Sequence, residues 1–472
     1  MATSRSRSQG RRTSQGEPAV GSGVGESAPS TPMPGTTGRY LVLMREDAVE
    51  SGVRALTDVA GLEVASTRDF VNGAVDSQTM GEAEAVIFDN LGVAVVDTPP
   101  DQLRSLRAAS DDSGILAIEP ERINYAIDEG GMSFTPPMIT GGGGGSFSAD
   151  YLRGYRDAVN HLADAMLGVS GIASGSVLAS TLEQLAFSDD REFTWGLRAT
   201  RVSDSHYSGK GVRVAVLDTG FDLEHPDFLG RNIVSRSFIS GEAVQDGHGH
   251  GTHCVGTACG PKMAGQGPRY GVAYNADIYV GKVLSNAGSG GDAGILAGIS
   301  WAISQKCHII SMSLGAPTAV GQGYSRIFEQ VARRALSAGT LIIAAAGNES
   351  ERPNLIAPVG HPANCPSIMA VAALDNRMGI APFSCGGREL QGGQVDIAGP
   401  GVGIRSSWPR PTLYRSISGT SMATPHVAGI AALYAEANSD VQGGALGWLL
   451  LQSAMRLSLP VSDIGAGLIQ AP

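Results

Sequence analysis

A serine near the C-terminal end of the chain lies within a run of small residues, Gly419-Thr-Ser421-Met-Ala-Thr-Pro-His-Val-Ala-Gly429. These neighbours leave the hydroxyl of Ser421 accessible, and the pattern is typical of the start of a helix. The first turn of a helix directs free backbone N–H groups and the positive end of its dipole at negative charge beside the oxygen. A Gly-Thr-Ser-Met sequence alone is more often a turn than a nucleophile, so the assignment depends on what else the chain supplies.

A serine nucleophile needs a base, and His250 in a segment rich in histidine and glycine is the candidate. Asp218, which follows the apolar run 212–217, is the candidate for the carboxylate that orients this base. A carboxylate that accepts the Nδ1 proton fixes the tautomer of an imidazole and stabilises the imidazolium formed when Nε2 takes the serine proton. We therefore predict a triad of Asp218, His250 and Ser421.

A second apolar run, 341–346, leads to Gly347 and then to the amide side chain of Asn348. An amide N–H₂ group does not titrate, so it is suited to donate a hydrogen bond to a developing oxyanion. We predict that Asn348 and the backbone N–H of Ser421 form an oxyanion hole.

These motifs resemble those of the subtilisin-like serine proteases, the subtilases. The resemblance covers roughly residues 193–470 and is carried by Val-Leu-Asp218-Thr-Gly, His250-Gly-Thr-His, Ser313-Leu-Gly315, Ala-Gly-Asn348 and Gly-Thr-Ser421-Met-Ala-Thr-Pro. The order Asp, His, Ser along the chain is the order known for the family. It implies a serine endopeptidase that hydrolyses peptide bonds through an acyl-enzyme. The alternative is a catalytically restrained homologue that binds peptides or has a regulatory role.

The resemblance also implies a substrate cleft in which an extended polypeptide is held as an added strand. Its candidate substrate-binding residues are Gly288, Ser289, Gly290, Ser313, Leu314, Gly315 and Glu349. The pocket for the residue before the scissile bond is expected to take a large apolar or aromatic side chain. Glu349 at its rim would let Lys or Arg be accepted as well.

Metal and thiol chemistry are the other uses of these residue types. Three histidines, His248, His250 and His253, could ligate zinc, but no acid or cysteine set with a usual ligand spacing accompanies them. We predict no metal site; the resemblance implies no required cofactor, and structural calcium, common in the family, is left unassigned. The five cysteines are odd in number and sparse, so no disulfide framework is expected. Cys254 resembles the free cysteine of the proteinase K-like branch, and we interpret it as a buried core residue rather than a redox group.

The elements that position the site belong to a predicted protease domain at 193–472. Short apolar runs alternate with helical stretches, which favours an α/β fold with a doubly wound, mostly parallel sheet. The runs are 212–217, 278–283, 309–313, 341–345 and 368–372, and the helical stretches are 292–305, 325–338 and 443–451. The candidate residues then fall at carboxyl ends of strands, where open α/β sheets bind ligands.

A smaller domain is predicted at 37–126. Strands at 39–44, 85–88, 91–96 and 115–118 with helices at 47–58 and 100–109, and one further short strand at 62–64, give a ferredoxin-like pattern, β-α-β-β-α-β with the short strand added. Before a subtilase domain, such a domain resembles an inhibitory propeptide. That resemblance implies an auto-inhibited zymogen whose own N-terminal domain is the inhibitor, with Asn124-Tyr125-Ala126 in the cleft. The alternative is an unrelated small domain or a partner-binding module.

Two further segments complete the predicted organisation. Residues 127–192 form a linker with the glycine run 141–145 and an amphipathic helix pattern at 151–167, an insertion that the usual arrangement lacks. Autoprocessing is expected near Ala126 or within 130–146. Residues 1–36 are expected to be a disordered leader without the apolar core of a secretory signal, so we predict a cytoplasmic protein and leave export open.

Composition agrees with this interpretation. The 472 residues are 42% hydrophobic, enough for a sizeable core. The net charge of −11 disfavours nucleic-acid partners, because polyanions need clustered Lys and Arg. No apolar run approaches the ~20 residues that a membrane-spanning helix requires.

Overall fold

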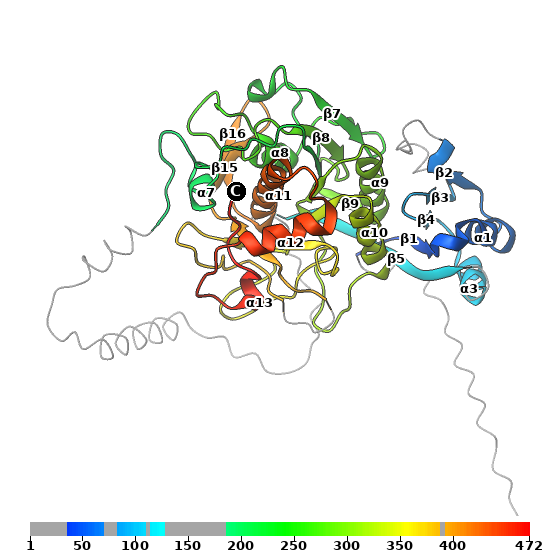
Figure 1. Ribbon diagram of the computed structural model, residues 1–472. Helices are drawn as coiled ribbons and strands as arrows, with labels where there is room; N and C mark the ends of the chain where they lie inside the picture. Colours follow the sequence, from blue (N-terminus) through cyan, green and yellow to red (C-terminus); the bar gives the residue numbers. More distant parts are fainter. Residues whose placement is uncertain (1–34, 70–82, 110–113, 128–185, 388–391) are drawn as a thin grey trace, which may run out of the picture.

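A computed structural model describes residues 35–69, 83–109, 114–127, 186–387 and 392–472 of the chain. A small N-terminal domain lies beside a larger α/β domain, and one long strand extends from the first into the second (Figure 1). The helix pattern at 151–167 and the glycine run at 141–145 lie outside the described residues.

The large domain is built on a seven-stranded sheet in which every neighbouring pair of strands is parallel. Its central strands are continuous apolar runs because both of their faces are buried. This confirms the predicted fold class. In sheet order the strands are β14 (Ile397–Pro400), β13 (Met369–Leu374), β12 (Leu341–Ala345), β10 (Ile309–Met312), β6 (Arg213–Asp218), β8 (Asp277–Lys282) and β7 (Ile233–Ser237).

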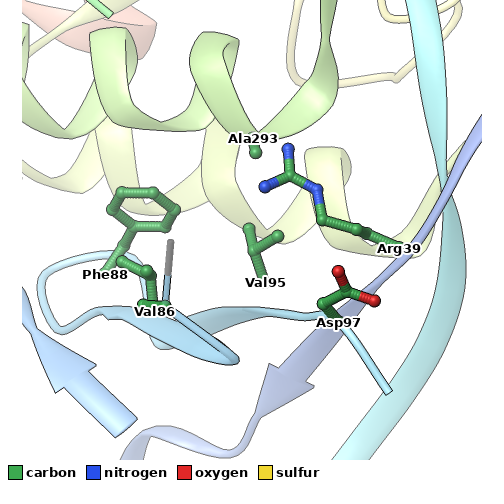
Figure 2. Close-up of a pocket in the computed structure, with 7 residues that line it drawn as sticks. Arg39, Val86, Phe88, Val95, Asp97 and Ala293 are labelled. Carbon is green, nitrogen blue, oxygen red and sulfur yellow. The ribbon is translucent and has the colours of Figure 1, made fainter. Parts of the chain in front are cut away.

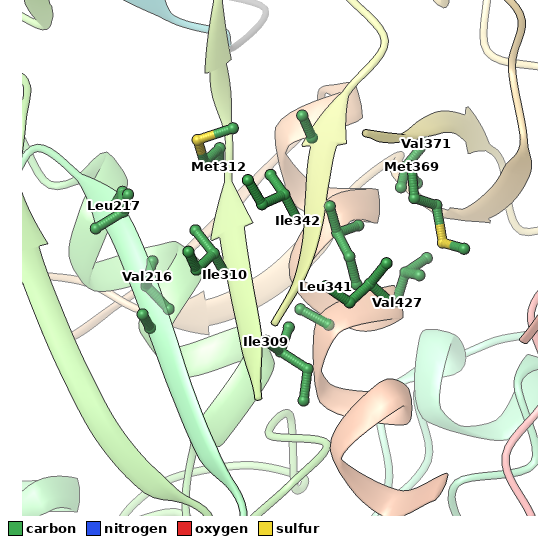
Figure 3. Close-up of a cluster of buried hydrophobic side chains, with 14 of the residues drawn as sticks. Val216, Leu217, Ile309, Ile310, Met312, Leu341, Ile342, Met369, Val371 and Val427 are labelled. Atoms are coloured by element: carbon green, nitrogen blue, oxygen red, sulfur yellow. The ribbon is translucent and has the colours of Figure 1, made fainter. Parts of the chain in front are cut away.

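Helices cover this sheet and form one core with it. Val427 of the longest helix lies among side chains of the central strands, including Ile342 and Met369 (Figure 3). The helices of the domain are α7 (Trp195–Ala199), α8 (His250–Cys259), α9 (Asp292–Ser304), α10 (Arg326–Ser337), α11 (Thr420–Ala437), α12 (Gly443–Ser453) and α13 (Val461–Ile464). A separate two-stranded hairpin is formed by β15 (Ile404–Ser407) and β16 (Tyr414–Ile417).

The carboxyl ends of three central strands carry the polar residues that the sequence singled out. Asp218 ends β6, Ser313 follows β10, and Asn348 lies just beyond β12. Because these strands are parallel neighbours, the three residues lie at the same edge of the sheet.

The N-terminal domain is an open sheet in the order β5-β1-β4-β3-β2. Its elements are β1 (Thr36–Met44), α1 (Val49–Arg54), β2 (Val64–Ser66), β3 (Ala85–Phe88), β4 (Val93–Val96), α3 (Pro100–Ala108) and β5 (Ile115–Ala126). A short 3₁₀ turn and a π turn flank α1. The elements without β2 follow the ferredoxin-like order, and β2 is an additional edge strand parallel to β3.

Alternation along the strands gives this small sheet two apolar faces. Val42 and Met44 belong to a core formed with the domain's own helices. Leu41 and Leu43 face the other way and join the core of the large domain. On that side Phe88 and neighbouring side chains of the sheet point toward the start of α9 (Figure 2). The N-terminal sheet is therefore packed between its own helices and the large domain.

Strand β5 is longer than the pattern of apolar residues predicts. The expected strand ends at residue 118, whereas β5 continues to Ala126. Beyond residue 118 the strand is mostly polar and contains Pro120, so periodicity alone does not identify this part. Its last residues, 123–126, find their strand partners in the large domain, at β9 (Ser289–Gly291) and β11 (Leu314–Gly315).

Two smaller findings bear on chemistry. All five cysteines are buried free thiols. No helix within the described ranges is both long and apolar enough to span a bilayer.

Candidate active site

Asp218 and His250 form a close buried pair at the carboxyl edge of the sheet. The Nδ1 atom of His250 lies 2.7 Å from Oδ1 of Asp218, and both side chains are excluded from solvent. The Asp218 oxygen also accepts the N–H of Thr219 at 2.7 Å, which holds the carboxylate in place. His250 is the first residue of α8, so the strand end and the helix start together fix the pair.

This pairing sets the charge of the imidazole. Burial by itself would lower the pKa of His250, but the Asp218 carboxylate 2.7 Å away opposes burial, and the net pKa lies well above its ordinary value. The Nε2 atom is buried without a hydrogen-bond partner among the described residues. The ring therefore holds a proton readily and presents its other nitrogen to the cleft.

Ser421 is the second residue of α11, but its hydroxyl is not bonded to His250. Its Oγ donates instead to the carbonyl of Ser313 at 3.0 Å, while the Ser313 hydroxyl donates to the Ser421 carbonyl at 2.8 Å. Cys254 lies between His250 and Ser421, because its Sγ is 3.8 Å from His250 Nδ1 and 3.6 Å from the Ser421 carbonyl oxygen. The structure thus gathers the three candidate catalytic residues and leaves the serine hydroxyl turned toward Ser313.

Hydrogen bonds from Thr420 fix the orientation of the Asn348 amide. Its Oδ1 accepts hydrogen bonds from both the backbone N–H and the hydroxyl of Thr420, at 3.0 and 2.9 Å. The Nδ2 group is consequently free to donate into the cleft, where it lies 3.4 Å from the carbonyl oxygen of Ile127. Sequence reasoning missed Thr420, and its position directly before Ser421 was the only signal.

The second half of β5 lies in the cleft as an antiparallel strand between two short strands of the large domain. Asn124 and Tyr125 pair with Gly290 and Ser289 of β9 on one side. On the other side the same strand pairs with β11, where Tyr125 is opposite Gly315. The candidate substrate-binding segments 288–290 and 313–315 are therefore the ones that hold β5.

The main chain beyond β5 continues to the candidate catalytic residues. The Ala126 N–H donates to the Gly288 carbonyl at 2.9 Å, and the Ile127 N–H approaches the Ser313 carbonyl at 3.5 Å. Ile127, assigned to the linker on the sequence pattern, thus lies in the cleft with its carbonyl at Asn348. Its side chain reaches the glycine of β11, since a Cβ added at Gly315 would lie 3.2 Å from Ile127 Cδ1.

Comparison with known proteins assigns this arrangement to a family. The sequence model of the subtilase family matches residues 209–467, more than half of the chain. The chain belongs to the subtilase family. It is 42% identical over 239 residues to Subtilisin E of Bacillus subtilis (strain 168), covering 50% of this chain and 58% of that protein. Against Subtilisin of Bacillus pumilus the identity is 41% over 239 residues, 50% of this chain and 81% of the relative.

A third relative of the subtilase chain is Subtilisin Savinase of Lederbergia lenta, 40% identical over 255 residues that make up 52% of this chain and 87% of the relative. The chain spans just over half the length of Subtilisin E, the first of these relatives. The matched half of the chain is the large domain together with its cleft.

Among the described residues, one group in the subtilase site has ligand atoms close enough together to hold a metal ion. Ligand atoms of Asp218, His250 and Cys254 all lie within 4.8 Å of one another. Burial raises the pKa of the Cys254 thiol to about 11, and a protonated thiol is a poor ligand. His253, considered above as a zinc ligand, has Nε2 bonded to the Ile404 carbonyl at 2.9 Å, and burial lowers its pKa to about 3.

Glu349, predicted to lie at the rim of the substrate pocket, directly follows Asn348. The side chain is exposed, and its Oε2 accepts a hydrogen bond from Cys385 Sγ at 3.1 Å. Burial is the larger cause and the nearby Glu349 carboxylate the second cause that raises the pKa of Cys385 well above its ordinary value. A Cβ added at Gly347 would lie 2.5 Å from Glu349 Oε2, so the carboxylate lies close to the Gly347 backbone.

Two glutamates of β5 bind helix starts of the subtilase domain, and no pattern in the sequence identified either. Glu121 is fully buried and accepts the N–H of Ala293 at 2.8 Å, at the first turn of α9. Glu119 accepts from the hydroxyl of Ser325 at 2.7 Å and from the N–H of Arg326 at 2.8 Å, at the start of α10. Each carboxylate satisfies N–H groups that a helix start leaves free and complements the helix dipole.

Proposed function

We propose that this chain is a serine endopeptidase that hydrolyses polypeptides through Asp218, His250 and Ser421. The observation that carries the proposal is a peptide carbonyl, that of Ile127, within reach of Asn348 Nδ2 on a strand held between β9 and β11. That is the position a scissile carbonyl takes when its oxygen is to become an oxyanion.

In the proposed reaction Ser421 Oγ bonds to the scissile carbonyl carbon while His250 Nε2 takes the hydroxyl proton. Asn348 Nδ2 and the Ser421 backbone N–H donate to the oxygen as it becomes negative. The C–N bond then breaks, and His250 gives its proton to the leaving amine. Water, deprotonated by His250, hydrolyses the acyl-enzyme and restores the serine.

The first step requires the serine hydroxyl to turn. Its present acceptor is the Ser313 carbonyl, which also lies 3.5 Å from the N–H of Ile127. A rotation about χ1 of Ser421 exchanges this acceptor for the unpartnered Nε2 of His250. We infer that the present arrangement is the resting form of an occupied cleft.

We further propose that the N-terminal domain inhibits the enzyme from within the same chain and is removed by autoprocessing. Strand β5 occupies the cleft, and its Glu119 and Glu121 bind the starts of α10 and α9, which supports this role. The expected cut is the Ile127–Asp128 bond, adjacent to the segment ending at Ala126. The 130–146 segment is the alternative site, because its sequence is rich in glycine and small polar residues, the composition at which proteolytic nicking concentrates.

The test is labelling of purified protein with a fluorophosphonate, which reacts only with an activated serine. Wild-type protein should be labelled at Ser421 and should yield, by mass spectrometry, a fragment that ends at Ile127. Ser421→Ala protein should remain unlabelled and uncut. Wild-type protein that is neither cut nor labelled would favour the restrained, peptide-binding homologue, for which the orientation of the Ser421 hydroxyl is the one supporting observation.

The residue before the cut is proposed to be apolar, as Ile127 is. Glu349 at the rim would add acceptance of Lys or Arg by a partly solvated ion pair worth at most about 1 kcal/mol. A substrate library with a strict preference for Asp or Glu at this position would contradict the proposal.

A cytoplasmic location also stays a prediction, to be tested by fractionation of the cells that produce the protein.

A further inference from the structure

The end of the cleft remote from Ser421 contains a buried carboxylate that binds a side chain of β5. The Nδ2 group of Asn124 donates to Oδ1 of Asp292 at 2.8 Å, and both residues are fully buried. With Ile127 at the catalytic residues, Asn124 is the fourth residue before the proposed cut.

A histidine completes this pocket from another part of the chain. The Nε2 atom of His361 lies 3.3 Å from the same Asp292 oxygen, and His361 is 2% exposed. Its ring packs edge to face on Phe328, with ring centroids 4.6 Å apart. The other Asp292 oxygen accepts the backbone N–H of Arg122 at 2.8 Å.

Asp292 is the first residue of α9, where a carboxylate commonly binds the N–H groups of its own helix. Within the described ranges it does not do so. Glu121 accepts the N–H of Ala293 instead, and the oxygens of Asp292 are used by β5 and His361. The carboxylate therefore points into the cleft, where it accepts hydrogen bonds from the strand that lies there.

We propose that Asp292, positioned by His361, makes this subsite select a side chain that donates hydrogen bonds, with asparagine the preferred residue four positions before the cut. The inference rests on the proposed endopeptidase function and adds a specificity determinant to it. Leucine has nearly the shape of asparagine but no donor, so it would bury the Asp292 oxygen with only the longer His361 contact to satisfy it. Aspartate would bring a second carboxylate against the first.

The experiment uses the processed enzyme and three p-nitroanilides that differ only at the fourth residue: Asn-Tyr-Ala-Ile, Leu-Tyr-Ala-Ile and Asp-Tyr-Ala-Ile. We expect kcat/KM for the asparagine substrate to exceed that for leucine by about 10- to 100-fold, the value of one buried hydrogen bond to a charged acceptor. The aspartate substrate should be the poorest of the three.

The Asp292→Leu variant tests the cause of the preference. Its asparagine-to-leucine ratio should fall to one or below, and Asp292→Asn should give an intermediate ratio. Because the ratio is taken within each enzyme, a general loss of activity does not affect it. His361→Ala should lower the ratio less than Asp292→Leu does, since His361 acts only through Asp292.

Failures of the two proposals are distinguishable. No turnover of any of the peptides, together with no fluorophosphonate labelling, would overturn the endopeptidase and this inference with it. If the wild-type enzyme turns over the asparagine and leucine peptides with kcat/KM values within threefold of each other, only the inference about Asp292 is overturned. This outcome does not depend on whether the variants fold.

Discussion

The cleft contains two buried Asp–His pairs, one at each end, and they face opposite ways. In the first, His250 lies between Asp218 and the cleft, with Nε2 unpartnered. In the second, Asp292 lies between His361 and the strand in the cleft. The first arrangement offers a base to a reacting atom, whereas the second offers an acceptor to a side chain. One pair of residue types thus suits catalysis or recognition according to which member faces the peptide.

This difference predicts separate kinetic effects. Changes at the first pair should act on kcat, because the interaction with His250 strengthens only as the serine proton moves. Changes at the second pair should act on the choice of peptide.

The largest effect is expected from Ser421→Ala. Removing the nucleophile should lower kcat by about 10⁶-fold and abolish self-cleavage. The measurement is hydrolysis of an asparagine-containing p-nitroanilide, with Ser337→Ala, an exposed serine on α10, as the matched control. Retained activity in Ser421→Ala would remove the catalytic assignment altogether.

Asp218→Asn is expected to lower kcat by about 10⁴-fold, because the amide favours the wrong tautomer of His250. It should also move the acid limb of the pH profile. The wild-type enzyme needs neutral His250, whose pKa is raised above 6.5, so its activity should fall as the pH decreases toward and below that pKa. Without the carboxylate the limb should shift to lower pH.

Asp292→Asn serves as the control for that shift. His361 does not reach the reacting atoms in the proposed reaction, so the acid limb should stay where it is in the wild type. If both variants moved the limb equally, the contrast between the two pairs would be wrong.

Local sequence predicted one end of this cleft far better than the other. Asp218, His250 and Ser421 each lie in a short motif next to a strand end or a helix start, so nearby residues suffice to identify them. The pair of Asp292 and His361 joins positions 69 residues apart, and the Asn124 that it binds is 168 residues from Asp292. Its existence depends on tertiary contacts that no local pattern encodes.

The same reason explains the length of β5. Its first half alternates with the small domain's own core and was predicted, whereas its polar second half is a strand because β9 and β11 supply the partners. The orientation of the Ser421 hydroxyl could not be predicted from the sequence either. It depends on a carbonyl, that of Ser313, which the peptide in the cleft shares.

Asn348→Ala is expected to lower kcat by about 10²- to 10³-fold with little change in KM. The Nδ2 group lies 3.4 Å from the Ile127 carbonyl, a long contact that tightens only as the oxygen gains charge. Steady-state kinetics on one peptide would test this. The contrary result, a raised KM at unchanged kcat, would mean that Asn348 binds the ground state in the way we propose for Asp292.

The smallest effect concerns two histidines that have no carboxylate partner. Burial lowers the pKa of His253 to about 3 and that of His426 to about 4. Their neighbour His250, with Asp218 beside it, has a raised pKa instead. Between pH 6.5 and about 4 the unfolded chain binds more protons at His253 and His426 than the folded chain does. The stability that these neutral rings contribute is therefore complete above pH 6.5 and is lost as the pH falls.

Each of the two histidines should remove about 1.4 kcal/mol of unfolding free energy per pH unit within that window. His250 adds no slope there, since below pH 6.5 its ring is protonated in both states. Denaturant unfolding of Ser421→Ala protein, which does not digest itself, should show this loss between pH 6.5 and 5. Burial raises the pKa of Asp396 to about 6, which offsets part of this loss below pH 6. Replacing His426 with Gln in that background should therefore be compared with the parent at each pH, and should lower the slope by the His426 share of about 1.4 kcal/mol per pH unit. An unchanged slope would mean that the buried rings accept protons in the folded state, and the contrast between a histidine with a carboxylate and one without would not hold.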